Sequence, residues 1–285
     1  MPQTLTDIKA LLAAHGLRPK HHLGQHFLHD GNQMERIVNA ACIEPCDLVL
    51  EVGAGTGALS MRLLESAARL VAVELDADLK PILLSQFQPY GQATILVQAD
   101  VLRSKHQINP LVLDALCAMG SDLPTEDPPP FKLVANLPYD IASPLLAMMA
   151  TSCVPMGHAV VTVQREVADR LTAAVGGKAY GPLTVCIQAM CYVEQIAVVS
   201  PSCFWPQPQV ESSIVCLRRR ESPLTDCPEA LKQTVRHLFG HRRKQLKTIL
   251  RRHFPGHAVP DDLNPMARPE QLTVEQWIRL SRCLY

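Results

Sequence analysis

A glycine-rich stretch, Leu50–Gly57, constrains the fold more than any other part of this chain. It reads LEVGAGTG, follows an apolar run at 47–50 and precedes a helical pattern at 58–67. This order predicts a strand, a tight turn and a helix, in which glycines allow a close ligand approach that a Cβ would block. The helix start also offers free N–H groups. We expect a nucleotide-like ligand here, although Gly53, Gly55 and Ala58 also fit the dinucleotide fingerprint.

Strand and helix patterns alternate along the first two thirds of the chain. Hydrophobic spacing predicts helices at 4–15, 33–41, 58–67, 79–87, 144–149 and 165–172, and strands at 47–52, 69–74, 93–97, 131–135, 158–163 and 214–217. Such alternation is typical of an α/β, Rossmann-like, doubly wound and mostly parallel sheet. The segment Gly120–Pro130 is rich in Pro, Ser and Asp, which predicts a surface excursion.

Four of the predicted strands end in a polar or glycine group. These groups are the glycine turn, Glu74, Asp100 and Asn136. Ligands of open parallel sheets bind outside the carboxyl ends of the strands, so we expect the four groups to meet there. Glu74 is placed to accept from ribose hydroxyls and Asp100 from an adenine amine. An adenosyl group fits either NAD or S-adenosylmethionine.

The tetrapeptide after the fourth strand favours S-adenosylmethionine. Asn136-Leu137-Pro138-Tyr139 is of the [Asn/Asp]-Pro-Pro-Tyr type found in amino-methylating enzymes. The lone pair of an adenine N6 amine is conjugated with the ring, which makes the amine a poor nucleophile. Acceptors at the Asn136 side chain and the Leu137 carbonyl can draw the nitrogen toward tetrahedral geometry and stabilise its growing positive charge. Tyr139 can stack on the base.

Histidines and cysteines raise the question of a metal. Four histidines, at 21, 22, 26 and 29, lie within nine residues, but no cysteine accompanies them. The segment is open to three interpretations: a zinc site, a polar loop, or a lid over the cofactor. The ten cysteines contain no C-x-x-C pair. We predict reduced, mostly buried thiols and no metal.

The overall composition limits the possible partners and location. No run of 18 apolar residues occurs, and the first residues match neither a signal nor a transit peptide, so we expect a cytoplasmic protein without a membrane span. The formal net charge is zero, yet residues 216–285 hold 14 basic and 7 acidic residues. A basic end on a neutral chain predicts a polyanionic partner.

Together these motifs resemble the ribosomal RNA adenine N6,N6-dimethyltransferase family, of the small-subunit, kasugamycin-sensitivity type. The matching stretches cover nearly the whole chain and are LGQHFLHD, LEVGAGTGALS, VAVELD, QAD, NLPYDIASPLL, VQREVADRL, KAYGPLTV, FWPQPQVESS and FGHRRKQLKTIL. The chain departs from the family at His26, where Asn is usual, and in a longer 120–130 excursion.

The resemblance implies a cofactor, a reaction and a set of site residues. It implies that S-adenosylmethionine is bound by residues His26, Leu28, Gly53, Gly55, Glu74, Asp100 and Asn136. It implies dimethylation of two adjacent adenosines near the 3′ end of small-subunit ribosomal RNA. The 204–213 segment resembles a stiff, proline-containing loop of the family. Such a loop would hold Phe204 against the second face of the adenine on Tyr139, although Phe204 and Trp205 could instead be core aromatics.

The basic end predicts a second, RNA-binding unit. We expect residues 1–220 to form the methyltransferase domain and residues 221–285 a helical domain, with its last helix at 270–282. Apolar residues at 235, 238, 239, 246, 249 and 250 predict a helical stripe. Six bases at 242–252, with no acid among them, fall largely off this stripe. We predict that Arg242, Arg243, Lys244, Lys247 and Arg251 bind RNA phosphates, although such a face is often only solvated.

Other functions stay open at this point. One alternative is a resistance methylase that acts on large-subunit ribosomal RNA, since such enzymes share the tetrapeptide. Another is a non-catalytic ribosome-assembly or transcription factor, and a weak fourth is a dehydrogenase, for which no hydride-transfer acid is evident. We expect a monomer.

Overall fold

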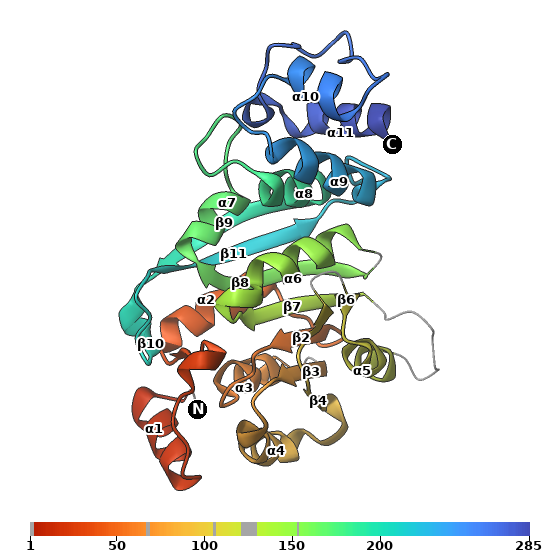
Figure 1. Ribbon diagram of the computed structural model, residues 1–285. Helices are drawn as coiled ribbons and strands as arrows, with labels where there is room; N and C mark the ends of the chain where they lie inside the picture. The colour runs from red at the N-terminus through yellow and green to blue at the C-terminus, as the bar shows by residue number, and fades with distance from the viewer. Residues whose placement is uncertain (1–2, 67–68, 105–106, 121–129, 153) are drawn as a thin grey trace.

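The computed structural model describes residues 3–66, 69–104, 107–120, 130–152 and 154–285. Within these ranges the chain forms a seven-stranded sheet with helices on both faces and further helices beyond one edge (Figure 1). The strand order is β4-β3-β2-β7-β8-β11-β9. The first five strands in this order are parallel, and β11 is antiparallel to both of its neighbours. The predicted α/β, mostly parallel architecture is confirmed.

The strands of the sheet lie close to their predicted positions. Their bounds are β2 (Leu48–Val52), β3 (Arg69–Glu74), β4 (Thr94–Gln98), β7 (Phe131–Asn136), β8 (Met156–Gln164), β9 (Cys191–Val199) and β11 (Ser212–Arg219). Two short pairs stand apart: β1 (Phe27–Leu28) with β10 (Phe204–Trp205), and β5 (Leu102–Ser104) with β6 (Gln107–Ile108). The sequence analysis missed β9, which forms an edge of the sheet.

The helices differ more from prediction. Their bounds are α1 (Leu5–Ala14), α2 (Gly31–Ala41), α3 (Ala58–Glu65), α4 (Lys80–Phe87), α5 (Pro110–Gly120), α6 (Tyr139–Thr151), α7 (Arg165–Leu171), α8 (Pro182–Met190), α9 (Pro228–Phe239), α10 (Leu246–His253) and α11 (Val274–Leu284). Helices α5 and α8 were not predicted. Helix α6 begins at Tyr139, five residues before its predicted start, and carries Pro144 inside it. The excursion predicted at 120–130 lies almost wholly outside the described residues.

Two hydrophobic layers hold the sheet in place. Because side chains alternate along a strand, Leu48 and Leu50 of β2 join the cluster under α5, α6 and α8, whereas Val49 joins the cluster under α2 and α3. Each fully buried aliphatic side chain contributes about 1.5–3 kcal/mol to stability. The sheet is thus held between helices on both faces, and the carboxyl ends of its parallel strands can contribute side chains to a site.

The carboxyl-terminal helices share the core of the sheet. Val235 of α9 and Trp277 of α11 belong to the same buried cluster as Val161 of β8. The Tyr180 hydroxyl donates to the carbonyl of Leu272, at 2.8 Å. The division after residue 220 stays a prediction, since the two regions are joined by one continuous core.

The predicted helical stripe at 235–250 is wrong in one respect. It is divided between α9 and α10, with a turn from Gly240 to Gln245. Arg242, Arg243 and Lys244 therefore lie in this turn, and only Lys247 and Arg251 lie on a helix. Similarly, the last helix starts at Val274 rather than at residue 270, because Thr273 caps it.

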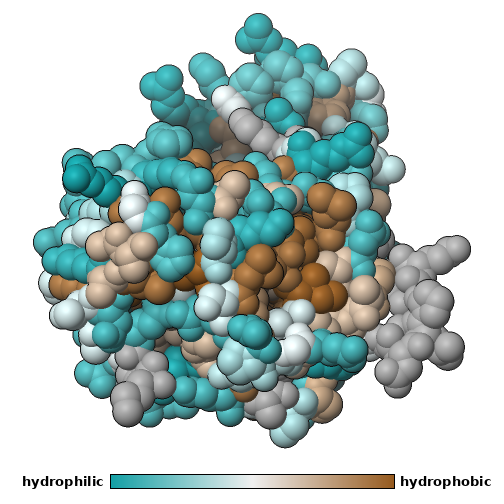
Figure 2. All heavy atoms as spheres, turned by 90° about the horizontal axis from the view of Figure 1, so that it is seen from below, coloured by the Kyte–Doolittle hydropathy of each residue, from teal (hydrophilic) through white to brown (hydrophobic). Residues whose placement is uncertain are grey.

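The surface is mixed in character at the β4 edge of the sheet. Viewed from below, hydrophobic residues gather in the middle of this face between hydrophilic ones (Figure 2). Four of the five residues of β4 are only partly buried, as an edge strand allows. In the described part of the chain, every helix is too short or too polar to cross a bilayer.

Candidate active site

A cavity of about 200 Å³ lies at the carboxyl ends of β2, β3 and β7. Its walls come from residues 22–28, the glycine turn, the end of β3, residues 99–101 and residues 136–141. The lining includes every residue predicted to bind the cofactor, namely His26, Leu28, Gly53, Gly55, Glu74, Asp100 and Asn136. It also includes Leu137, Pro138 and Tyr139. The expectation that four strand ends meet is therefore confirmed geometrically.

The glycine turn has room for backbone only. Gly53, Gly55 and Gly57 have φ angles of +78°, +60° and +83°, which L side chains rarely adopt. A Cβ on Gly53 would lie 3.1 Å from the Pro138 ring, and one on Gly55 would lie 3.1 Å from the Phe27 ring. The turn is thus in close contact with both the tetrapeptide and the 22–28 segment.

Glu74 is held in one orientation by backbone donors. Its two carboxylate oxygens accept from the N–H of Gly55 and the N–H of Asp76, each at 2.8 Å. The side chain is 7% exposed, and burial raises its pKa above the usual value despite these bonds. Each oxygen still has a lone pair that can accept from a ligand hydroxyl.

Asn136 presents one unused acceptor. Its Nδ2 donates to the carbonyl of His26, at 3.0 Å. Its Oδ1 is buried and has no hydrogen-bond partner among the described residues. Buried polar atoms are rarely left unpaired, so this oxygen is suited to a donor that a ligand brings. The bond to His26 fixes which end of the amide is the acceptor.

Tyr139 starts α6 with its ring at the cavity. Its hydroxyl lies 2.7 Å from the Ser212 hydroxyl, on β11. The imidazole of His26 stacks against the Tyr139 ring, with the two ring centroids 5.7 Å apart and an angle of 27° between the ring planes. His26 is itself held, because its Nδ1–H donates to the carbonyl of Pro206 at 2.6 Å. The sequence did not predict that His26 contacts the tetrapeptide on both Asn136 and Tyr139.

Part of the histidine-rich segment, residues 22–28, forms one wall of the cavity, and its interpretation as a lid over the cofactor stays a prediction. The Nζ of Lys20 bonds Asp76 at 2.6 Å and Asp78 at 2.7 Å, and the Gln25 amide donates to Asp76 at 2.7 Å. Burial alone would raise the pKa of Asp76, but the bonds from Lys20 and Gln25 outweigh it and lower that pKa. Pairing of β1 with β10 ties the segment down on its other side.

Three site residues depart from expectation. Phe204 is 3% exposed, packs in the cluster under α2 and α3, and is not part of the cavity wall. Its role in stacking stays a prediction. Asp100 lies at the rim, where its carboxylate accepts from the N–H of Leu102 at 2.9 Å. Glu51, an acid inside the apolar β2 run, lines the cavity and was missed.

Glu51 is the most perturbed acid of the site. It is buried, and the Ser60 hydroxyl donates to it at 2.5 Å. Burial raises its pKa to about 8, with a smaller contribution from the neighbouring charge of Glu74. An acid within an apolar strand was the available sequence signal.

The predicted RNA-binding bases are not equivalent in the structure. The guanidinium of Arg242 lies 3.5 Å from the carboxylate of Glu270 and also bonds the carbonyl of Lys178 at 3.4 Å. Arg243, Lys244, Lys247 and Arg251 form no ion pair within the described residues. Arg242 thus joins the turn to the sheet domain, whereas the other four are available to a polyanion.

Comparison with known proteins assigns this architecture to a family. Residues 16–284 match the family described as ribosomal RNA adenine dimethylase. The chain belongs to this family. It is 36% identical to ribosomal RNA small subunit methyltransferase A of Opitutus terrae, over 97% of each chain. It is 38% identical to the protein of that name from Synechococcus elongatus, over 90% of this chain and 92% of the relative.

Two solved structures of methyltransferases have a fold similar to that of this chain. The 23S rRNA methyltransferase ErmE is 26% identical, has a TM-score of 0.67, and covers 90% of this chain and 99% of its own. A dimethyladenosine transferase from Plasmodium falciparum has a TM-score of 0.71 at 24% identity, over 90% and 96% of the two chains. The chain is an S-adenosylmethionine-dependent rRNA adenine dimethyltransferase.

The residues present fit S-adenosylmethionine. The glycine turn lines the cavity with backbone at positive φ angles that L side chains rarely adopt, Glu74 has acceptor capacity in a fixed orientation, and Asn136 Oδ1 has no hydrogen-bond partner among the described residues. These three features lie around one cavity.

Proposed function

We propose that this enzyme dimethylates the N6 amines of two adjacent adenosines near the 3′ end of small-subunit ribosomal RNA, as a step in maturation of that subunit. Small-subunit specificity is supported by the names of relatives 36% and 38% identical over most of the chain. The observation that supports the chemistry is the buried Oδ1 of Asn136, which has no hydrogen-bond partner among the described residues and lines the same cavity as Tyr139.

The cofactor would be held by residues of four strand ends. Glu74 accepts from the ribose hydroxyls, Asp100 accepts from the adenine amine, and the backbone of Gly53 and Gly55 lies against the ligand. His26 and Leu28 cover it from the 22–28 segment. When bound, S-adenosylmethionine supplies an electrophilic methyl group.

The tetrapeptide would activate the target amine. In the first transfer Asn136 Oδ1 and the Leu137 carbonyl would each accept one N6 hydrogen, which makes the nitrogen lone pair available and stabilises the charge that develops on it. In the second transfer a single N6 hydrogen remains, so only one of the two acceptors would bind it. Pro138 fixes the backbone between them. Tyr139 stacks on the base, an interaction worth about 1–3 kcal/mol. This offsets much of the few kcal/mol needed to extrude the adenine from its RNA stack. Proximity then supplies much of the rate.

The basic segment would bind RNA phosphates. We propose that residues 221–285 act as the RNA-binding unit through Arg243, Lys244, Lys247 and Arg251, with Arg242 contributing to their placement. Such contacts release counterions and make the affinity depend on salt. We further propose that the enzyme works as a cytoplasmic monomer.

Two other functions remain distinguishable by experiment. The similarity to ErmE makes large-subunit RNA the main competing substrate. A non-catalytic assembly factor would need the same RNA-binding surface but not an acceptor at Asn136.

The test is methyl transfer from labelled S-adenosylmethionine to undermethylated small ribosomal subunits, followed by nuclease digestion and nucleoside mass analysis. We expect N6,N6-dimethyladenosine, mapped to two neighbouring positions near the 3′ end. Transfer only to large-subunit RNA would contradict the substrate. RNA binding without transfer to either RNA would contradict catalysis.

A further inference from the structure

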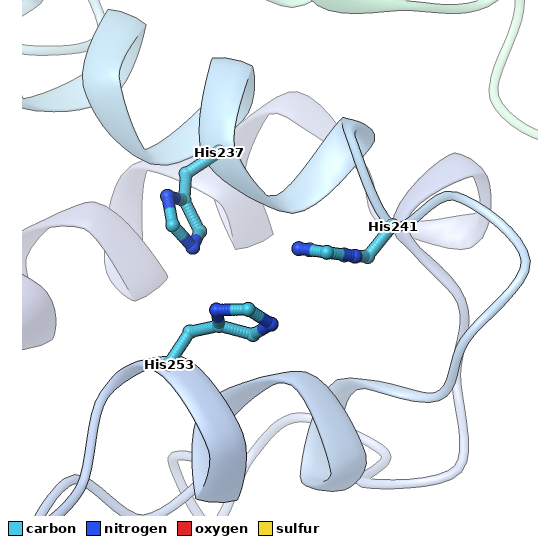
Figure 3. A group of neighbouring side chains, drawn as sticks. All are labelled: His237, His241 and His253. Atoms are coloured by element: carbon cyan, nitrogen blue, oxygen red, sulfur yellow. The ribbon is translucent and has the colours of Figure 1, made fainter.

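Three histidines of the carboxyl-terminal region converge on one point, outside the cavity. His237 lies in the last turn of α9, His241 in the turn that follows, and His253 at the end of α10. Each ring offers one nitrogen, and these three nitrogens lie within 4.8 Å of one another. The rings face a common space between the two helices (Figure 3). In sequence they form H-x3-H-x11-H.

The three rings are packed together rather than bonded elsewhere. His241 and His253 stack with centroids 4.3 Å apart, and the ring of Phe254 lies edge-on to His237 at 5.0 Å. No hydrogen bond to any of the three imidazoles is found in the part of the chain that the structure describes. Their nitrogens are therefore available to a ligand.

We propose that His237, His241 and His253 bind one divalent transition-metal ion, with Zn²⁺ the expected occupant. Neutral imidazole suits Zn²⁺, Ni²⁺ and Cu²⁺. Tetrahedral Zn²⁺ with Zn–N bonds of about 2.0–2.1 Å needs ligand nitrogens about 3.4 Å apart, which small side-chain rotations from the present separations provide. Three protein ligands leave a fourth position for water or an anion.

Opposing charges act on a cation at this site: two helix dipoles favour it, whereas the charge of Arg252, next to His253, opposes it. His237 and His253 lie in the last turns of α9 and α10, where the helix dipoles place partial negative charge. Arg242, next to His241, is turned toward the carboxylate of Glu270.

The proposed site brackets the basic segment. His241 directly precedes Arg242 and His253 directly follows Arg252, so all six bases at 242–252 lie between two ligands. Binding would close this segment into a metal-linked loop and fix both of its ends to α9. This role is separate from methyl transfer, because none of the three histidines lines the cavity.

The experiment uses the full-length chain without a histidine tag, freed of metal by chelation. Zn²⁺ is titrated calorimetrically into the wild type, three single variants (His237→Gln, His241→Gln and His253→Gln) and the control His257→Gln, a nearby histidine outside the cluster. Circular dichroism checks that each variant is folded. Because three single variants are made, the test still works if one of them does not fold. Co²⁺ absorption reports the ligand type.

We expect one equivalent of Zn²⁺ in the wild type and the control. Each of the three variants should bind at least about 100-fold more weakly, since even outer contacts of a metal site are worth about 10–100-fold. Tetrahedral Co²⁺ bands without thiolate charge transfer would identify imidazole ligands. Absence of stoichiometric binding, binding unchanged in the three variants, equal loss in His257→Gln, or strong thiolate bands would each overturn the proposal. Such bands would point to cysteine ligands, since the prediction of mostly buried thiols is wrong for four cysteines that are exposed: Cys42, Cys46, Cys227 and Cys283.

Discussion

Replacing Asn136 with alanine separates the chemistry of this site from its architecture. The Nδ2 bond to the His26 carbonyl is an ordinary hydrogen bond of 3.0 Å, so its loss should lower the free energy of unfolding by about 1–3 kcal/mol. The Oδ1 atom has no hydrogen-bond partner in the described part of the chain, so its loss removes no such bond from the described fold. We propose that Oδ1 stabilises the transition state. Removal of one hydrogen-bonding group of this kind lowers kcat about 10²–10³-fold, which corresponds to about 2.7–4 kcal/mol of transition-state stabilisation.

Single-turnover methyl transfer at saturating RNA and S-adenosylmethionine measures this loss directly. Asn136→Asp keeps an acceptor oxygen and should retain more activity than Asn136→Ala. Asn39→Ala, which removes an exposed amide on α2, is the matched control and should be unaffected. RNA affinity should be the same in all four proteins. A rate for Asn136→Ala within about threefold of the wild type would refute the role of Oδ1 in activating N6.

Three further perturbations test the remaining parts. Gly53→Ala places a Cβ 3.1 Å from Pro138 at positive φ and should cost at least about 1–2 kcal/mol of stability and weaken S-adenosylmethionine binding, both measurable by thermal unfolding with and without ligand. Gly31→Ala meets no atom and should be neutral or slightly stabilising, and equal effects would contradict the steric argument. Burial raises the pKa of Glu51 from the ordinary 4.5 to about 8, so its contribution to stability falls as the pH rises from about 4.5 to about 8, because in this range the carboxyl is ionised in the unfolded chain but still protonated in the folded one. The free energy of unfolding of Glu51→Gln, measured with urea, should therefore increase relative to that of the wild type over this range, and parallel curves would contradict this. Alanine at Arg243, Lys247 and Arg251 together should reduce the slope of log affinity for RNA against log salt by about 2, whereas Lys232→Ala should leave it unchanged; an unaltered slope in the triple variant would show that these bases do not bind phosphate.

The parts predicted well from sequence are those with short-range signals. The strand–turn–helix around Gly53 follows from glycine and hydrophobic spacing, and the meeting of Glu74, Asp100 and Asn136 follows from the rule for parallel sheets. Other elements lack such signals. Helix α8 passes directly into β9 at Met190 with neither Gly nor Pro between them, so their boundary is invisible in the pattern. Pro144 suggested a helix start, but it lies inside α6.

Contacts between distant segments were the least predictable. The stacking of His26 on Tyr139 joins residues more than a hundred positions apart, and Phe204 is in the core because β10 pairs with β1. The histidines at 237, 241 and 253 converge because the chain turns after α9 and brings His253, at the end of α10, back to His237 and His241. Spacing along the sequence carries no information on such folding back.

The continuous core under β8, α8, α9 and α11 gives the enzyme a fixed span. Trp277 and Val161 belong to one packed cluster, so the separation between Lys247 and the cavity is set by close-packed side chains and not by a flexible linker. If the basic segment anchors the RNA, the target adenine must then lie at a set number of nucleotides from the anchored phosphates. Such an enzyme would select its adenines by their distance along the folded RNA from the anchored phosphates, as well as by the neighbouring bases.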